Sequence, residues 1–140
     1  MINKGDLSEA SEKLNDILAQ NPGHIEGIYC LAVCQRKQRN YTQALDNLNQ
    51  VLVKVPGHGR AYQEQGFTHK ALGETSKAIT ALEKAVALNP ALFGSWLVLA
   101  DEPDYTMRHE AKKHVDRLAS LLHALVRVMS SIHSKQLHLT

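Results

Sequence analysis

Two stretches of equal length decide the fold: Ile25–Pro56 (IEGIYCLAVCQRKQRNYTQALDNLNQVLVKVP) and Gly59–Pro90 (GRAYQEQGFTHKALGETSKAITALEKAVALNP). Each ends in proline, and Pro22, Pro56 and Pro90 follow one another at a spacing of 34 residues. Aligned on these prolines, small and aliphatic residues coincide: Ala10, Ala44 and Ala78, then Leu14, Leu48 and Leu82. A fixed period of this length predicts a chain built from stacked copies of one supersecondary unit.

Each stretch contains two helical segments. Apolar residues recur three and four positions apart in both segments, the spacing of one face of an α-helix. Turn residues separate the segments at Gly5-Asp6, Arg39-Asn40 and Gly73-Glu74. Asp6 with Glu9, and Asn40 with Gln43, have the spacing of a capping box, so we expect Asp6 and Asn40 to cap helices. The prolines end the second helix of each unit.

A helix-turn-helix unit of 34 residues, with small residues at its eighth and twentieth positions and proline at its thirty-second, resembles the tetratricopeptide repeat (TPR) family. The resemblance implies an all-α fold, a right-handed α-solenoid of TPR repeats with a C-terminal capping helix. We expect one domain over residues 1–140. It comprises a half repeat at 5–22, repeats at 25–56 and 59–90, a degenerate repeat at 93–121, and a helical cap or partial repeat at 122–140.

The C-terminal third departs from the repeat. Pro103 predicts that the preceding helix ends near Ala100 or Asp101, with Asp104 or Thr106 capping the next one. Nothing breaks a helix from 107 to 134, which favours one long helix over two. Its apolar residues form a heptad-like seam: Ala111, Val115, Leu118, Leu122, Leu125, Met129 and Ile132. Leu121, Val126 and Val128 lie off the seam, which indicates a missing neighbour or weak self-association through the 107–134 helix.

Composition disfavours several classes of protein. No apolar run is long enough to span a membrane and no secretion signal opens the chain, so we expect a cytoplasmic protein without membrane contact. The net charge of +2 is low for a nucleic-acid binder, and no aromatic residue interleaves the basic cluster of Arg108, Lys112, Lys113 and Arg117.

The residue patterns also disfavour a metal site or a catalytic site in this chain. The histidine spacings lack the pattern of a zinc site, and Cys30 and Cys34 read as reduced thiols packed between helices. No nucleophile elbow or phosphate loop occurs. We therefore predict no enzyme activity, no catalytic residues, no bound metal and no cofactor.

The TPR resemblance implies a scaffold that binds a protein or peptide in a concave groove. The second, fifth, ninth, twelfth and thirteenth positions of each repeat line that groove in the family. In this sequence they correspond to Glu26, Tyr29, Val33, Arg36, Lys37, Arg60, Gln63, Phe67, Lys70 and Leu97. Two aromatic rings and four cations against one carboxylate favour an extended peptide with acidic character.

One alternative belongs to another class. The Trp96–Asp101 run and the helix after it look like the repeat region that precedes a sulfotransferase domain in some bacterial proteins. The chain would then be the N-terminal TPR segment of a larger enzyme. Any sulfuryl-donor site would lie beyond Thr140.

Overall fold

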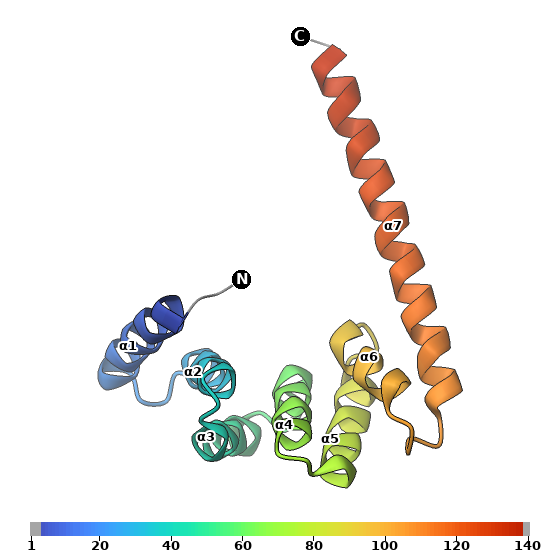
Figure 1. Ribbon diagram of the computed structural model, residues 1–140. Coiled ribbons are helices and arrows are strands. Elements are labelled where there is room, and N and C mark those ends of the chain that lie inside the picture. The colour runs from blue at the N-terminus through green and yellow to red at the C-terminus, as the bar shows by residue number, and fades with distance from the viewer. Residues whose placement is uncertain (1–3, 139–140) are drawn as a thin grey trace. The chain divides into compact units, whose positions relative to one another are not determined.

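The computed structural model describes residues 4–138, which form seven helices and no strand (Figure 1). The helices are α1 (Lys4–Gln20), α2 (Ile25–Lys37), α3 (Tyr41–Lys54), α4 (Gly59–Ala71), α5 (Thr75–Leu88), α6 (Phe93–Asp101) and α7 (Arg108–His138). The predicted all-α class is confirmed. Contacts divide the chain into two compact units, of which the first ends at Ser95 and the second begins at Trp96.

The first unit is a stack of helices in chain order. Contacts join α1 to α2, α2 to α3, α3 to α4, and α4 to α5, so sequential helices are neighbours (Figure 1). In addition, α2 contacts α4, which places the first helices of consecutive repeats beside each other. Stacking of helix pairs in this way is a solenoid, as the sequence period predicts.

Equivalent residues begin the first helix of each repeat. His24 precedes α2 and accepts a hydrogen bond at Nδ1 from the Gly27 N–H at 2.8 Å. His58 precedes α4 and accepts one at Nδ1 from the Ala61 N–H at 3.1 Å. Each ring nitrogen satisfies a backbone donor that the first turn of a helix leaves free. The two histidines that follow the repeat prolines are therefore N-caps.

Equivalent residues also end these helices. After α2 the Asn40 N–H bonds the Gln35 carbonyl, and after α4 the Glu74 N–H bonds the His69 carbonyl. This pattern places one residue in the left-handed region. The residue is Arg39 (φ 66°) in one repeat and Gly73 (φ 77°) in the next.

The core lies between the helices of each pair. Ala44, Leu48 and Val51 of α3 are fully buried, and Leu82 and Ala85 of α5 occupy the equivalent positions. A Cβ built on Gly66 of α4 would lie only 2.5 Å from Leu82 Cγ. Glycine is therefore what permits α4 and α5 to approach at this level.

Three capping predictions are wrong. Asn40 stands at the N-cap of α3, but its side chain makes no capping hydrogen bond. Asp6 lies inside α1, which already begins at Lys4. Neither Asp104 nor Thr106 directly precedes α7, which begins at Arg108 after Met107.

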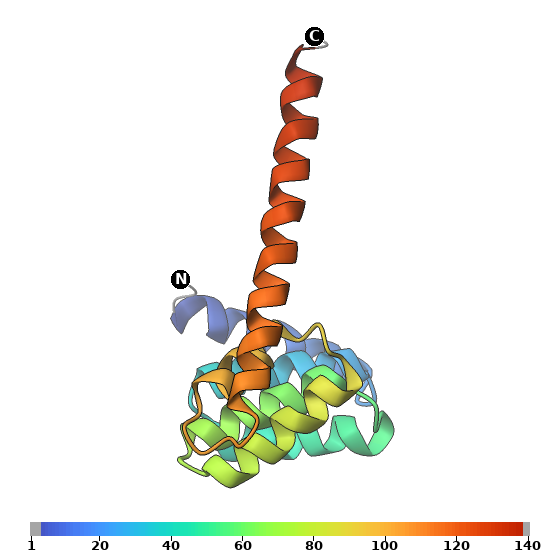
Figure 2. The same cartoon turned by 90° about the vertical axis from the view of Figure 1, so that its right-hand side faces the viewer.

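The second unit contains most of α6 and all of α7. The helix before Pro103 ends at Asp101, as predicted. Trp96 of α6 stacks on His114 of α7, with ring centroids 4.0 Å apart. The prediction of one long helix is confirmed, since α7 runs unbroken for 31 residues (Figure 2). Every residue from Ser120 to Leu137 is exposed.

Candidate functional site

Nine of the ten predicted groove residues lie on α2 and α4, the two helices that contact each other across repeats. Their spacing of three and four places them along one side of each helix. We call this set the α2–α4 face: Glu26, Tyr29, Val33, Arg36 and Lys37 of α2, and Arg60, Gln63, Phe67 and Lys70 of α4. Leu97, the tenth residue, belongs to the second unit and is 44% exposed.

The N-terminal end of the face is a cluster of four side chains. Glu26 Oε1 lies 3.1 Å from His58 Nε2, and Glu26 Oε2 accepts a hydrogen bond from Arg60 Nη2 at 3.3 Å. The Arg60 guanidinium lies 5.0 Å from the centroid of the Tyr29 ring, which in turn lies 4.9 Å from the His58 ring. Ionic and cation–π contacts thus join the two repeats at this end.

A second cluster lies nearer the middle of the face. Arg36 Nε donates a hydrogen bond of 2.5 Å to Glu64 Oε2, and the guanidinium lies 5.3 Å from the Phe67 ring centroid. Glu64 is only 6% exposed, whereas its partner Arg36 reaches the surface. A carboxylate this buried requires a cation beside it. Arg36 therefore holds α2 against α4.

Close packing fixes the two neutral residues of α4. Gln63 Oε1 accepts a hydrogen bond from the fully buried Ser95 hydroxyl at 2.7 Å. A Cβ built on Gly94 would lie 3.2 Å from Phe67 Cζ and 3.3 Å from Gln63 Oε1. The glycine therefore leaves room for the half-buried Phe67 ring.

The remaining face residues differ in burial. Val33 is half-buried and packs against the core cluster of Tyr29, Ala32 and their neighbours. Lys37 and Lys70 are exposed in the last turns of α2 and α4. The C-terminal end of the face is consequently basic at its surface.

Tyr29 belongs to the core as well as to the predicted groove. It is 8% exposed and is a member of the core cluster. Burial raises the pKa of the Tyr29 phenol above its ordinary value, and the Glu64 carboxylate raises it further. The ring is therefore part of the core that supports the α2–α4 face.

Cys30 corrects a prediction. The structure buries Cys34 but leaves Cys30 exposed, so the expectation that both thiols pack between helices is wrong for Cys30. Partial burial of the Cys30 sulfur, followed by the nearby Glu26 carboxylate, raises the pKa of this thiol. A thiol with a raised pKa forms less of the reactive thiolate at neutral pH.

Sequence reasoning missed Glu64 and His58 as members of the site. The repeat period could have indicated the contact between Glu26 and Arg60. These residues are 34 positions apart and so occupy equivalent positions in consecutive repeats. Opposite charges at equivalent positions of stacked repeats face each other. The Arg36–Glu64 pair has a separation of 28 residues, which the repeat period alone does not indicate.

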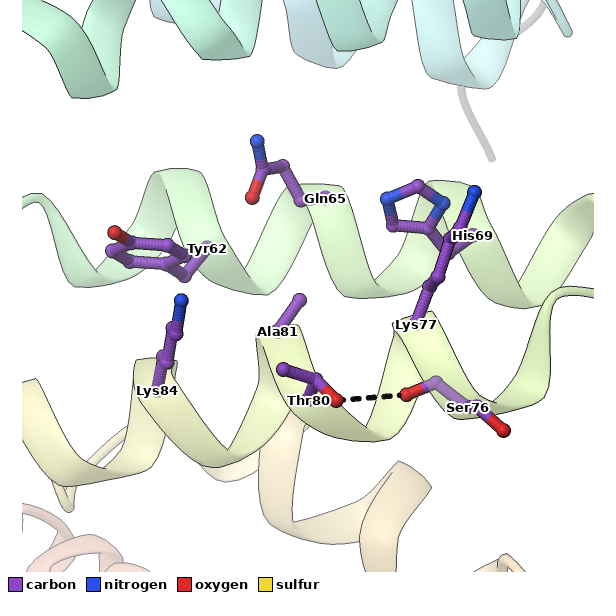
Figure 3. A pocket seen from close by; sticks show the side chains of 8 residues that line it. All are labelled: Tyr62, Gln65, His69, Ser76, Lys77, Thr80, Ala81 and Lys84. Atoms are coloured by element: carbon purple, nitrogen blue, oxygen red, sulfur yellow. Dashed lines mark hydrogen bonds between the residues drawn. The ribbon is translucent and has the colours of Figure 1, made fainter.

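A pocket of about 330 Å³ lies on another side of α4, between that helix and α5 (Figure 3). Its cations are engaged: Lys84 Nζ lies 5.5 Å from the Tyr62 ring centroid, and Lys77 Nζ lies 2.9 Å from Glu74. The hydrogen bond from Lys77 holds the pKa of the Glu74 carboxyl below its usual range. The lining residues are Tyr62, Gln65, His69, Ser76, Lys77, Thr80, Ala81 and Lys84.

Residues 4–138, which the structure describes, lack two kinds of feature. They contain no group of three or more histidine, cysteine, aspartate or glutamate side chains arranged to hold a metal ion. They also contain no helix with the length and hydropathy needed to cross a membrane.

Relatives of the chain were found at the level of both sequence and structure. It is 32% identical over 108 residues to anaphase-promoting complex subunit 3 of Schizosaccharomyces pombe, a match that spans 76% of this chain but only 16% of that protein. A double mutant of MamA RS-1 superposes with a TM-score of 0.72 at 25% identity, covering 84% of this chain and 68% of that one.

Two further structures share the fold. A MamA fragment from Desulfovibrio magneticus RS-1 has a TM-score of 0.68 at 26% identity, with 86% of this chain and 68% of that chain covered. An O-GlcNAc transferase mutant from Thermobaculum terrenum has a TM-score of 0.71 at 22% identity, with 81% of this chain and 23% of that chain covered. Models described as tetratricopeptide repeat match residues 28–58 and 59–92. The chain carries tetratricopeptide repeats and belongs to that family.

Proposed function

We propose that this chain is a protein–protein interaction module and that its α2–α4 face binds an extended peptide segment of a partner protein. The observation that carries the proposal is the cross-repeat set of contacts that holds Arg36, Arg60 and Phe67 in place before any ligand arrives. A surface ordered in advance loses less side-chain entropy on binding. Aromatic and arginine side chains also dominate the energy of many interfaces.

The charges of the α2–α4 face favour a peptide segment that carries acidic residues. Four of the nine residues of the face are cations, which are Arg36, Lys37, Arg60 and Lys70, and one is a carboxylate, Glu26. Lys37 and Lys70 are exposed at the C-terminal ends of their helices. We propose that acidic groups of the peptide meet these lysines while an apolar side chain contacts the exposed part of Phe67.

A peptide library displayed on phage and selected on the full chain tests this proposal. Selected peptides should pair an apolar residue with nearby aspartate or glutamate. Phe67→Ala should weaken their binding by on the order of 1–2 kcal/mol, and Lys70→Ala should reduce its salt dependence. Lys84→Ala, on α5, is the control and should leave binding unchanged. Equal binding by all three variants would place the contact elsewhere.

We propose no catalytic role for this chain. Glu26, Arg36 and Arg60 are engaged in the ion pairs and cation–π contacts that join α2 to α4, which suits binding rather than proton transfer. A nucleophile with an adjacent base would be needed for covalent catalysis.

A second candidate is that the chain is the TPR segment of a larger protein, including a larger enzyme such as a sulfotransferase. The match to one curated relative spans 16% of that protein, and the fold matches 23% of a solved O-GlcNAc transferase chain. Reading the genomic sequence past the codon for Thr140 decides the point. A stop codon there would contradict it, and a further domain in frame would support it.

A further inference from the structure

The second half of α7 carries large apolar side chains along its length. Each is between 51% and 63% exposed: Leu121, Leu122, Leu125, Val126, Val128, Met129, Ile132 and Leu137. Monomeric proteins rarely leave so much contiguous apolar surface in water, and such a surface marks an interaction site.

The arrangement of these residues defines how wide the apolar surface is. On a heptad labelled a to g with Leu122 at a, Leu125 falls at d, Met129 at the next a, and Ile132 at the next d. Leu121 and Val128 then fall at g, and Val126 at e. From Leu121 to Ile132 the large apolar residues therefore occupy four positions of the heptad, and Leu137 falls at b.

The opposite side of the helix is polar. The b, c and f positions from 120 to 134 hold mainly polar side chains, which are Ser120, His123, Arg127, Ser130, Ser131 and Ser134. No acidic residue follows Asp116 in the chain, so α7 offers no carboxylate here for a salt bridge to a basic partner. Association through this stretch must depend on apolar packing.

The width excludes a simple pair of helices. A two-stranded coiled coil buries a and d and carries charges at e and g, where water reaches the side chains. Here Leu121, Val126 and Val128 take the e and g positions, so burying them requires a neighbour on each flank. Two-stranded coils also favour β-branched residues at a, whereas α7 has Leu122 and Met129 there.

We propose that the stretch from Leu118 to Leu137 of α7 packs against other copies of the same helix, in a bundle of more than two chains. Each copy offers on the order of 800 Å² of apolar surface, the amount that one partner contributes to a stable interface. An identical face on another copy is complementary because it is equally apolar and needs no opposite charge. This inference is independent of the α2–α4 face.

Sedimentation equilibrium of the full chain, over a wide range of concentration, tests the proposal. The mass should rise to that of three or four chains. Amide exchange from Ser120 to Ile132 should slow as the concentration rises. A mass of one chain at every concentration, with rapid exchange in this stretch, would overturn the proposal in favour of a different occupant. A limiting mass of two chains would overturn the claim of more than two.

Three variants locate the contact. Leu125→Glu, at d, should give a monomer. Val126→Glu combined with Val128→Glu, at e and g, should stop assembly at two chains. Ser131→Glu adds the same charge to the polar side and should leave the mass unchanged. Because Leu125 is exposed, circular dichroism should show the repeats of each variant still folded. Equal effects of Leu125→Glu and Ser131→Glu would contradict an apolar interface.

Discussion

Arg36 and Glu64, which come from the first helices of consecutive repeats, form an ion pair with Nε and Oε2 2.5 Å apart. Glu64 is buried, so the pair connects the core of the second repeat to the exposed face of the first. The same guanidinium lies beside Phe67. One interaction therefore joins two repeats and orders a residue of the proposed binding surface.

Removing one member of this pair should destabilise the chain. Glu64→Ala leaves Arg36 without its partner, and we expect a loss of about 1–3 kcal/mol in the free energy of unfolding by urea. Glu9→Ala is the control, because its pair with Lys13 is exposed and should contribute less than about 0.5 kcal/mol. Similar losses of stability in both variants would mean that the buried Arg36–Glu64 pair contributes no more than the exposed Glu9–Lys13 pair.

The two aromatic residues of the face should respond differently to truncation. Tyr29→Ala removes a ring from the core cluster and should cost about 3–5 kcal/mol of stability. Phe67→Ala removes a half-buried ring and should cost less than that, while weakening peptide binding more. Thermal unfolding and peptide binding measured on the same preparations separate the two roles. If the Tyr29→Ala chain unfolded at the same temperature as the wild type, the assignment of Tyr29 to the core would be contradicted.

Alkaline pH should destabilise the chain through Tyr29. Burial raises the pKa of its phenol in the folded state above the value of about 10 in the unfolded state. Its contribution is therefore complete below pH 10 or so and is lost as the pH rises through the folded-state pKa. Tyr29→Phe cannot ionise, so its stability should fall less steeply above pH 10. Urea titrations at several pH values measure this, and a Tyr29→Phe chain that loses stability above pH 10 as steeply as the wild type would contradict it.

Glycine at position 39 should stabilise the first full repeat. Arg39 has φ 66°, a conformation that costs a residue with a side chain about 1 kcal/mol and that Gly73 adopts at the equivalent position. Arg39→Gly should therefore raise the free energy of unfolding by up to about 1 kcal/mol. Arg39→Ala keeps the strain and controls for loss of the charge. A gain of equal size in both variants would assign the effect to charge.

The sequence predicts local structure better than it predicts contacts between repeats. The 34-residue period and Pro103 indicate the paired helices and the end of α6, because helix periodicity and proline geometry act within a few residues. Tyr29 shows where prediction from the sequence fails. Its spacing along α2 matches that of exposed face residues, yet His58 and Arg60 from the next repeat lie against its ring. Only the distance between two helices decides whether such a position is buried.

The close approach at Gly66 limits how freely the repeats can be exchanged. Its equivalent in the preceding repeat is Ala32, which is also fully buried. A methyl group at position 66 would collide with Leu82, itself fixed in the core. A synthetic array made by copying α2 in place of α4 would carry that methyl group into the collision. The two repeats look interchangeable in an alignment, but each first helix is fitted to the second helix of its own pair, so the transferable module is the whole hairpin.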